Sequence, residues 1–137
     1  MSIYNDVRDH EFDDPPERLM NDCGISLQSS IWLMAGGKSL AGRGRIELLE
    51  RIAEAGSIRQ AAIAMSMSYR AAWDAVDAMN QRAPEPVVSR STGGRGGGGA
   101  TLTGFGERLV AVFRTMESEQ VQHLKAMDRR LDELFSK

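Results

Sequence analysis

Three short stripes of apolar residues follow one another along residues 43–81, and this succession constrains the fold more than any other feature of the sequence. The first stripe has the three- and four-residue steps of an amphipathic helix and ends at Gly56, a residue type that often terminates helices. Ser57 can cap a second, shorter helix, and Ser68 can cap a third helix over residues 69–81. The sequence therefore predicts three short helices, of which the last two are joined by a tight turn.

Residues 87–102 have the pattern of a β-hairpin with a glycine-rich tip. Residues 87–91 predict one strand, residues 100–102 predict a returning strand, and six of the seven residues at 93–99 are glycine. The glycine run has three interpretations: the phosphate-binding loop of a nucleotide-binding protein, a flexible linker, or the wing of a DNA-binding domain. The first interpretation lacks the lysine and the helix start that such a loop requires. Because strands flank the run, the wing is favoured over the linker.

The segments outside this unit differ from it in composition. Residues 1–24 contain many acids and no sustained apolar period, so we expect them to be disordered. Residues 25–35 alternate in part and predict one short strand, which stops at a pair of glycines. From residue 103 to about residue 135 the chain predicts one long helix. The predicted organisation is an acidic N-terminal extension (residues 1–24), a winged helix-turn-helix domain (residues 25–103) and a long helix for dimerisation (residues 104–137).

The order of two capped helices, a tight turn and a hairpin is that of a winged helix-turn-helix, so the predicted fold class is mainly α with a β-hairpin wing. In such a domain the third helix fills the major groove of DNA, and its outer side must carry hydrogen-bonding groups. Although the net charge of the chain is −2, residues 38–108 contain ten Lys and Arg against seven acids. The candidate DNA-binding residues are Ser68, Tyr69, Arg70, Trp73, Asp74, Arg90 and Arg95.

The candidate residues have different expected roles. Arg70, in the first turn of the third helix, is placed for a guanine edge or a phosphate, and the two residues before it are placed for phosphates near the helix N-terminus. Arg95 lies among the glycines and can enter the minor groove, and Arg90 adds a second cation on the preceding strand. For Trp73 the pattern leaves two positions open, the edge of the core and the DNA-facing surface.

A helix over residues 103–135 would be about 50 Å long at 1.5 Å per residue, which exceeds what a small domain can cover. Its distal half therefore requires another surface. Apolar residues recur on one side at three- and four-residue steps, which predicts pairing with the same helix of a second subunit. His123 lies beside this seam and is interpreted as an interface residue rather than a metal ligand. The predicted dimer interface contains Phe113, Met116, Gln120, Leu124, Met127, Leu131 and Leu134.

The composition argues against several other functions. Cys23 is the single cysteine, and His10 and His123 lie far apart, so the supply of metal ligands is poor. No nucleophile, base and orienting group can be argued together, so we expect neither enzymatic activity nor a cofactor. The apolar stretches are too short to cross a membrane, and the acidic N-terminus does not resemble a secretory signal, which predicts a cytoplasmic protein without a membrane partner.

The motif at residues 68–80, Ser-Tyr-Arg-Ala-Ala-Trp-Asp-Ala-Val-Asp-Ala-Met-Asn, and the glycine-rich segment at 92–103 together carry a family resemblance. They closely resemble the N-terminal DNA-binding domain of the ModE-type molybdate-responsive transcriptional regulators, whose winged helix is akin to that of the LysR family. The resemblance runs from about Leu27 to about Glu117. It implies a homodimeric regulator of transcription that binds a palindromic operator on double-stranded DNA, at genes for molybdate uptake or molybdoenzymes.

The sequence also departs from the pattern of the full-length family members. In these proteins a region of small β-barrels follows the DNA-binding domain and binds molybdate or tungstate, whereas this chain ends at Lys137. We therefore expect that molybdate does not bind this chain. The alternative to a DNA-binding regulator is a winged-helix interaction module that forms heterodimers with a full-length relative.

Overall fold

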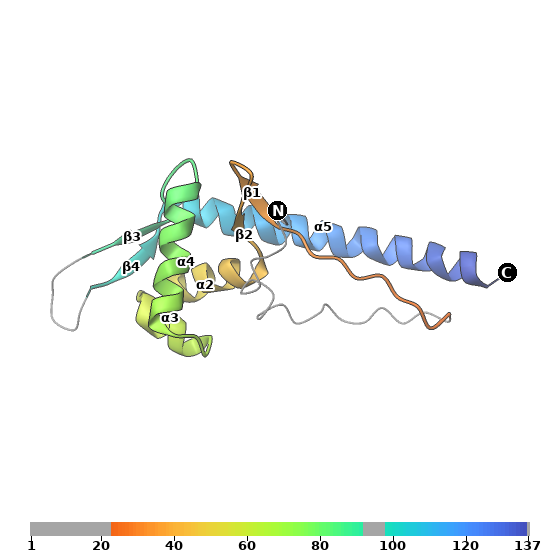
Figure 1. The fold of residues 1–137 in the computed structure, drawn as a ribbon, viewed down its shortest axis with the longest axis horizontal. Coiled ribbons are helices and arrows are strands. Elements are labelled where there is room, and N and C mark those ends of the chain that lie inside the picture. The colour runs from red at the N-terminus through yellow and green to blue at the C-terminus, as the bar shows by residue number, and fades with distance from the viewer. Residues whose placement is uncertain (1–22, 92–97, 137) are drawn as a thin grey trace.

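The computed structural model describes residues 23–91 and 98–136 of the chain (Figure 1). The predicted disorder of the N-terminal extension falls almost wholly on residues 1–22, which lie outside the described residues. The tip of the predicted wing, residues 92–97 with Arg95, also lies outside them.

Three helices form the centre of the fold, as the sequence predicts. They are α2 (Arg43–Ala55), α3 (Ile58–Ala64) and α4 (Tyr69–Arg82). Gly56 ends α2 with a left-handed backbone at φ 69°, a conformation that favours glycine. The Oγ atoms of Ser57 and Ser68 accept hydrogen bonds from the backbone N–H groups of Gln60 and Ala71, respectively, at the starts of α3 and α4. The predicted helices and caps are therefore confirmed.

The core lies where these three helices meet the hairpins and the start of the last helix. Of the predicted stripe on α4, Ala72, Val76 and Met79 are fully buried, and Ala75 is half-buried against them. The burial of small residues on this side lets α4 pack closely on α3. The largest fully buried side chains are Phe113, Ile46, Leu48, Leu49, Ile52, Met79, Val76 and Val87.

The predicted hairpin after α4 is present. Strand β3 (Val88–Arg90) pairs antiparallel with β4 (Ala100–Leu102), so that Val88 lies opposite Leu102 and Arg90 lies opposite Ala100. The hairpin projects from the helical centre on the side away from the C-terminal end of the chain (Figure 1). Together with α3 and α4 it makes the winged helix-turn-helix that the sequence predicts.

The prediction of one strand over residues 25–35 is correct only at the C-terminal end of that range. Only Leu33–Ala35 form a strand, β1, which pairs antiparallel with a second strand, β2 (Lys38–Ala41). The glycine pair forms the turn between β1 and β2, and Gly36 and Gly37 have the φ values of 58° and 78° that this turn requires. Because β2 has four residues, the pairing reaches no further back than Leu33.

Residues 23–32 have no strand partner and run instead along the last helix (Figure 1). The N–H of Leu27 donates to Oδ1 of Asp128 at 3.2 Å, and the side-chain amide of Gln120 donates to the hydroxyl of Ser29 at 3.2 Å. This extended segment therefore lies along one side of the distal part of that helix.

The last helix, α5 (Gly104–Phe135), is continuous over 32 residues, as predicted. It begins at Thr103, whose Oγ1 accepts a hydrogen bond from the N–H of Gly106. Its first half packs on α2 and β4, and its second half extends well beyond the three-helix centre (Figure 1). At 1.5 Å per residue the helix is about 48 Å long.

Candidate nucleic-acid interface

The outer face of α4 carries four of the predicted site residues near its N-terminus. The side chain of Arg70 is 88% exposed, and its Nε atom lies 3.4 Å from Oδ1 of Asp74, one turn further along. Such an exposed pair is weak because water screens both charges. The hydroxyl of Ser68 already accepts the capping hydrogen bond and retains its proton for a further acceptor. Arg70 is therefore held in the free protein by one surface contact that another acceptor can replace.

Trp73 connects the outer face of α4 to the hairpin. Its indole is half-buried against the core cluster, and the guanidinium carbon of Arg90 lies 4.1 Å from the ring centroid. A guanidinium stacked on an indole is attracted by the negative face of the ring. Of the two positions that the sequence leaves open for Trp73, the structure shows the edge of the core, where the indole also supports a cation of the hairpin.

Arg59 is a residue that the sequence analysis did not single out. It lies in the first turn of α3, and its guanidinium carbon is 4.5 Å from the ring centroid of Tyr69, the first residue of α4. The sequence signal for Arg59 was its position two residues after Ser57, the cap of the first helix of the helix-turn-helix. Its neighbour Tyr69 could not be inferred from that signal, because the contact depends on the crossing of the two helices.

The side chain of Asn80 fixes the hairpin relative to α4. Its Oδ1 accepts hydrogen bonds from the N–H groups of Val87 at 2.8 Å and Val88 at 3.1 Å, and its Nδ2 donates to the carbonyl of Val88 at 3.1 Å. Val87 and Val88 are both buried, so these three bonds serve backbone groups at the start of β3 that are shielded from water. Asn80 therefore sets where the hairpin leaves the helix.

Val87 also contacts the start of α5. The N–H of Thr103 donates to the carbonyl of Val87, and the hydroxyl of Thr103 donates to the carbonyl of Pro86 at 2.6 Å. A Cβ atom on Gly106 would stand 2.1 Å from the same Val87 carbonyl oxygen, so this position of α5 has space only for glycine. The base of the hairpin is consequently held by α4 on one side and α5 on the other.

The residues of the predicted dimer seam on α5 occupy three different environments. Phe113 is 1% exposed within a single chain, so it is a core residue and is not available to a partner. Leu124 is also buried in the single chain, on the part of α5 between the two hydrogen bonds to residues 27 and 29. The helical period shows which residues share a side, but it cannot show that the chain itself covers part of that side.

The other seam positions on α5 remain accessible. Met127 is 42% exposed and Leu134 is 64% exposed, whereas Gln120 and Leu131 are partly covered. Two apolar residues outside the predicted set, Val112 and Phe135, are exposed as well. We call the exposed apolar residues of α5 the α5 stripe; they are Val112, Met116, Met127, Leu134 and Phe135.

Among residues 23–91 and 98–136, no three His, Cys, Asp or Glu side chains are grouped so that they could hold a metal ion. Within the same described ranges, no helix combines the length and the apolar character that a membrane crossing requires.

Comparison with known proteins relates this chain to regulators of transcription. The family model of the bacterial regulatory helix-turn-helix proteins of the lysR family matches residues 44–107. The molybdenum transport protein ModE of Azotobacter vinelandii is 51% identical over 90 residues, which make up 66% of this chain and 33% of that protein. The DNA-binding transcriptional dual regulator ModE of Escherichia coli K12 is 48% identical over 84 residues, 61% of this chain and 31% of that protein.

Among solved structures, the full-length LTTR LysG of Corynebacterium glutamicum aligns with 65% of this chain and 29% of its own length, at 29% sequence identity and a TM-score of 0.47. The chain spans about a third of the length of the two curated relatives.

Proposed function

We propose that this chain, whose residues 44–107 match the lysR-family helix-turn-helix model and which is similar to ModE proteins, regulates transcription by binding double-stranded DNA as a homodimer. One observation carries the proposal. Three arginines from three different elements meet at the first half of α4: Arg59 from α3 stacks on Tyr69, Arg90 from β3 stacks on Trp73, and Arg70 lies on α4 itself. A cluster of guanidinium groups around an exposed helix is suited to a duplex, whose charge lies on the phosphates beside each groove.

In the proposed complex α4 enters the major groove and the hairpin lies along the adjacent backbone. Arg70 exchanges its weak pair with Asp74 for a guanine edge or a phosphate, and Asp74 becomes free to accept a hydrogen bond from the amino group of a cytosine. Arg59 and Arg90 flank the helix and contact phosphates, with Ser68 as a neutral donor at the helix start. We also propose that Arg95, in the glycine-rich segment, enters the minor groove.

The dimer of this proposal forms through the α5 stripe. Apolar side chains at 42% to 64% exposure along the distal helix are suited to burial against a second copy, because burial removes apolar surface from water. A dimer with twofold symmetry places two copies of α4 on successive turns of the same DNA face, which matches a palindromic operator. The relatives are named for molybdenum transport and transcriptional regulation, and we extend to this chain the proposal that its target genes concern molybdenum.

The test is fluorescence anisotropy with the full chain, first on mixed genomic DNA at low salt and then on duplexes selected from a random pool. The variant Arg70→Ala should lose discrimination at one operator position, by about 1–3 kcal/mol if Arg70 contacts a base. Arg51→Ala is the matched control, because Arg51 is also a surface arginine in intrahelical ion pairs but lies on α2. Absence of binding below about 100 μM, beyond the usual range for non-specific duplex binding, would favour the interaction module instead.

A further inference from the structure

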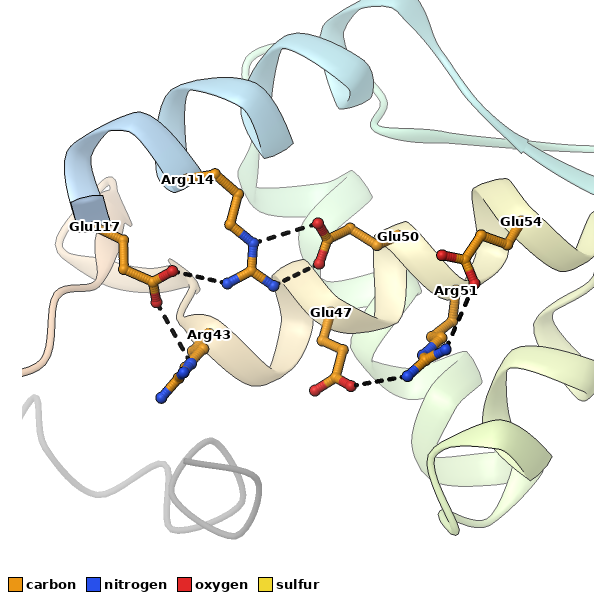
Figure 2. Close-up of polar contacts among 7 residues, drawn as sticks. All are labelled: Arg43, Glu47, Glu50, Arg51, Glu54, Arg114 and Glu117. Atoms are coloured by element: carbon orange, nitrogen blue, oxygen red, sulfur yellow. Dashed lines mark hydrogen bonds and ion pairs between the residues drawn. The ribbon is translucent and has the colours of Figure 1, made fainter. Parts of the chain in front are cut away.

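Four charged residues form a chain of contacts between α5 and α2 (Figure 2). The guanidinium of Arg114 on α5 donates through Nε and Nη2 to both carboxylate oxygens of Glu50 on α2. Through Nη1 it donates to Glu117 at 2.8 Å, and the second oxygen of Glu117 lies 3.5 Å from Nε of Arg43 at the start of α2. We call these four residues the α2–α5 clasp.

The geometry of the clasp differs from that of ordinary surface pairs. Arg114 makes a two-pronged contact with Glu50, which fixes direction as well as distance because the guanidinium is a rigid planar fork. The hydrogen bonds to Glu50 raise the pKa of Arg114 above its ordinary value, burial opposes this, and Glu117 raises the pKa further, so the group stays charged.

The clasp joins one turn of α5 to two separate turns of α2. Residues 43 and 50 are seven positions apart, or about 10 Å along the axis of α2. Phe113 anchors α5 in the core next to the clasp, and Phe105, Leu109 and Val110 pack against the same core, but apolar contacts have no preferred direction. Two polar attachments about 10 Å apart fix the angle of α5 over α2 more closely than these apolar contacts do.

The remaining length of α5 amplifies any such rotation. From Arg114 to Phe135 the helix runs about 32 Å. A tilt of about 10° at the clasp moves the end of α5 by roughly 5 to 6 Å, more than the 3.4 Å that separates neighbouring base pairs. In a dimer held together by the distal part of α5, this tilt changes the separation of the two α4 helices.

We propose that the α2–α5 clasp is a positioning device that sets the spacing between the two operator half-sites this regulator accepts. The proposal rests on the proposed function, since it requires DNA binding by a dimer paired through α5. Arg114 and Glu50 act through the angle of α5, at a distance from the DNA, and neither is part of the arginine cluster at α4.

The experiment compares full-chain variants on two kinds of DNA. Duplexes carry either one half-site, obtained by selection from a random pool, or two inverted half-sites with centres 9, 10, 11 or 12 base pairs apart, around the separation of about 10 that one helical turn imposes. Arg114→Met removes the charge and keeps most of the side-chain length. Glu50→Gln is a second variant of nearly the same shape that leaves the pair between Arg114 and Glu117 in place.

Arg51→Met is the matched control. Arg51 lies one residue from Glu50, is 42% exposed against 34% for Arg114, and also bridges two carboxylates, Glu47 and Glu54. Both glutamates belong to α2 itself (Figure 2). Loss of the Arg51 ion pairs therefore changes no angle between helices. Thermal melts followed by circular dichroism verify that each variant is folded at the temperature of the assay.

The expected result is specific to spacing. Wild type and Arg51→Met should bind the duplex of preferred spacing about tenfold more tightly than duplexes of the neighbouring spacings. Both clasp variants should reduce this preference to about twofold. They should bind the single half-site with the affinity of wild type. An unchanged spacing preference in the clasp variants, or an equal loss on single and paired half-sites, would overturn the proposal. Failure of wild type to bind any half-site would refute the proposed function itself.

Discussion

Replacement of Asn80 by alanine should destabilise the whole domain, because this side chain makes three hydrogen bonds between the end of α4 and the start of the wing. The change removes three hydrogen bonds and leaves the N–H groups of Val87 and Val88 without the acceptor that they share. Both valines are buried, at 0% and 3% exposure, so water cannot easily take its place. At about 1–3 kcal/mol for each of the two buried donors left unsatisfied, the expected loss is about 2–6 kcal/mol. This is a large fraction of the 5–15 kcal/mol that stabilises a typical domain.

The assay is urea unfolding at one fixed protein concentration, since dimerisation makes apparent stability depend on concentration. With a slope of about 2 kcal/mol per molar urea, the midpoint of Asn80→Ala should fall by about 1–3 M. Asn80→Asp retains the shared acceptor and loses only the donated bond, so its midpoint should lie between those of Asn80→Ala and wild type. Gln81→Ala, which removes one exposed bond to Asp77, is the control. A midpoint for Asn80→Ala equal to that of the control would refute the reasoning.

Three further predictions concern other parts of the molecule. Gly106→Ala should destabilise the fold by about 3 kcal/mol in the same urea assay, because its Cβ would stand 2.1 Å from the Val87 carbonyl oxygen. Gly104→Ala, with open space around its Cβ, is the control and should leave the midpoint unchanged, and equal midpoints for the two variants would contradict this reasoning. Met127→Glu should shift the protein towards the monomer in sedimentation velocity, and an intact dimer would place the interface elsewhere. Arg90→Met should weaken binding to all DNA sequences and reduce the salt dependence by about one ion, and an unchanged slope would remove Arg90 from the interface.

The parts of the fold that follow from local sequence signals could be predicted. Ser57 and Ser68 cap helices because each has a free backbone N–H within reach three residues later, and Gly56 ends a helix because its backbone tolerates positive φ. These effects act within one turn of chain. The helices and the wing therefore follow from the sequence without knowledge of the tertiary structure.

The parts that depend on distant partners could not be predicted. A glycine pair after an alternating segment is compatible with a strand end or a turn, and only the packing of Leu40 and Ala41 into the core distinguishes the two. In the candidate site, the exposed residues on α4 follow from helical periodicity. Their partners Arg59 and Arg90 lie on other elements, 10 and 17 residues away from Tyr69 and Trp73, and periodicity carries no information on such pairs.

The stack of Arg90 on Trp73 has a consequence for the entropy of binding. A free arginine side chain gives up as much as about 2 kcal/mol of rotamer freedom when it becomes fixed. Arg90 loses much of this freedom when the protein folds, because the indole already holds its guanidinium, whereas Arg70, held only by an exposed pair with Asp74, keeps more of it until it meets a ligand. In the proposed complex two arginines of equal charge thus contribute differently: Arg90 as a rigid, preorganised contact, and Arg70 as an adaptable one that can select among sequences.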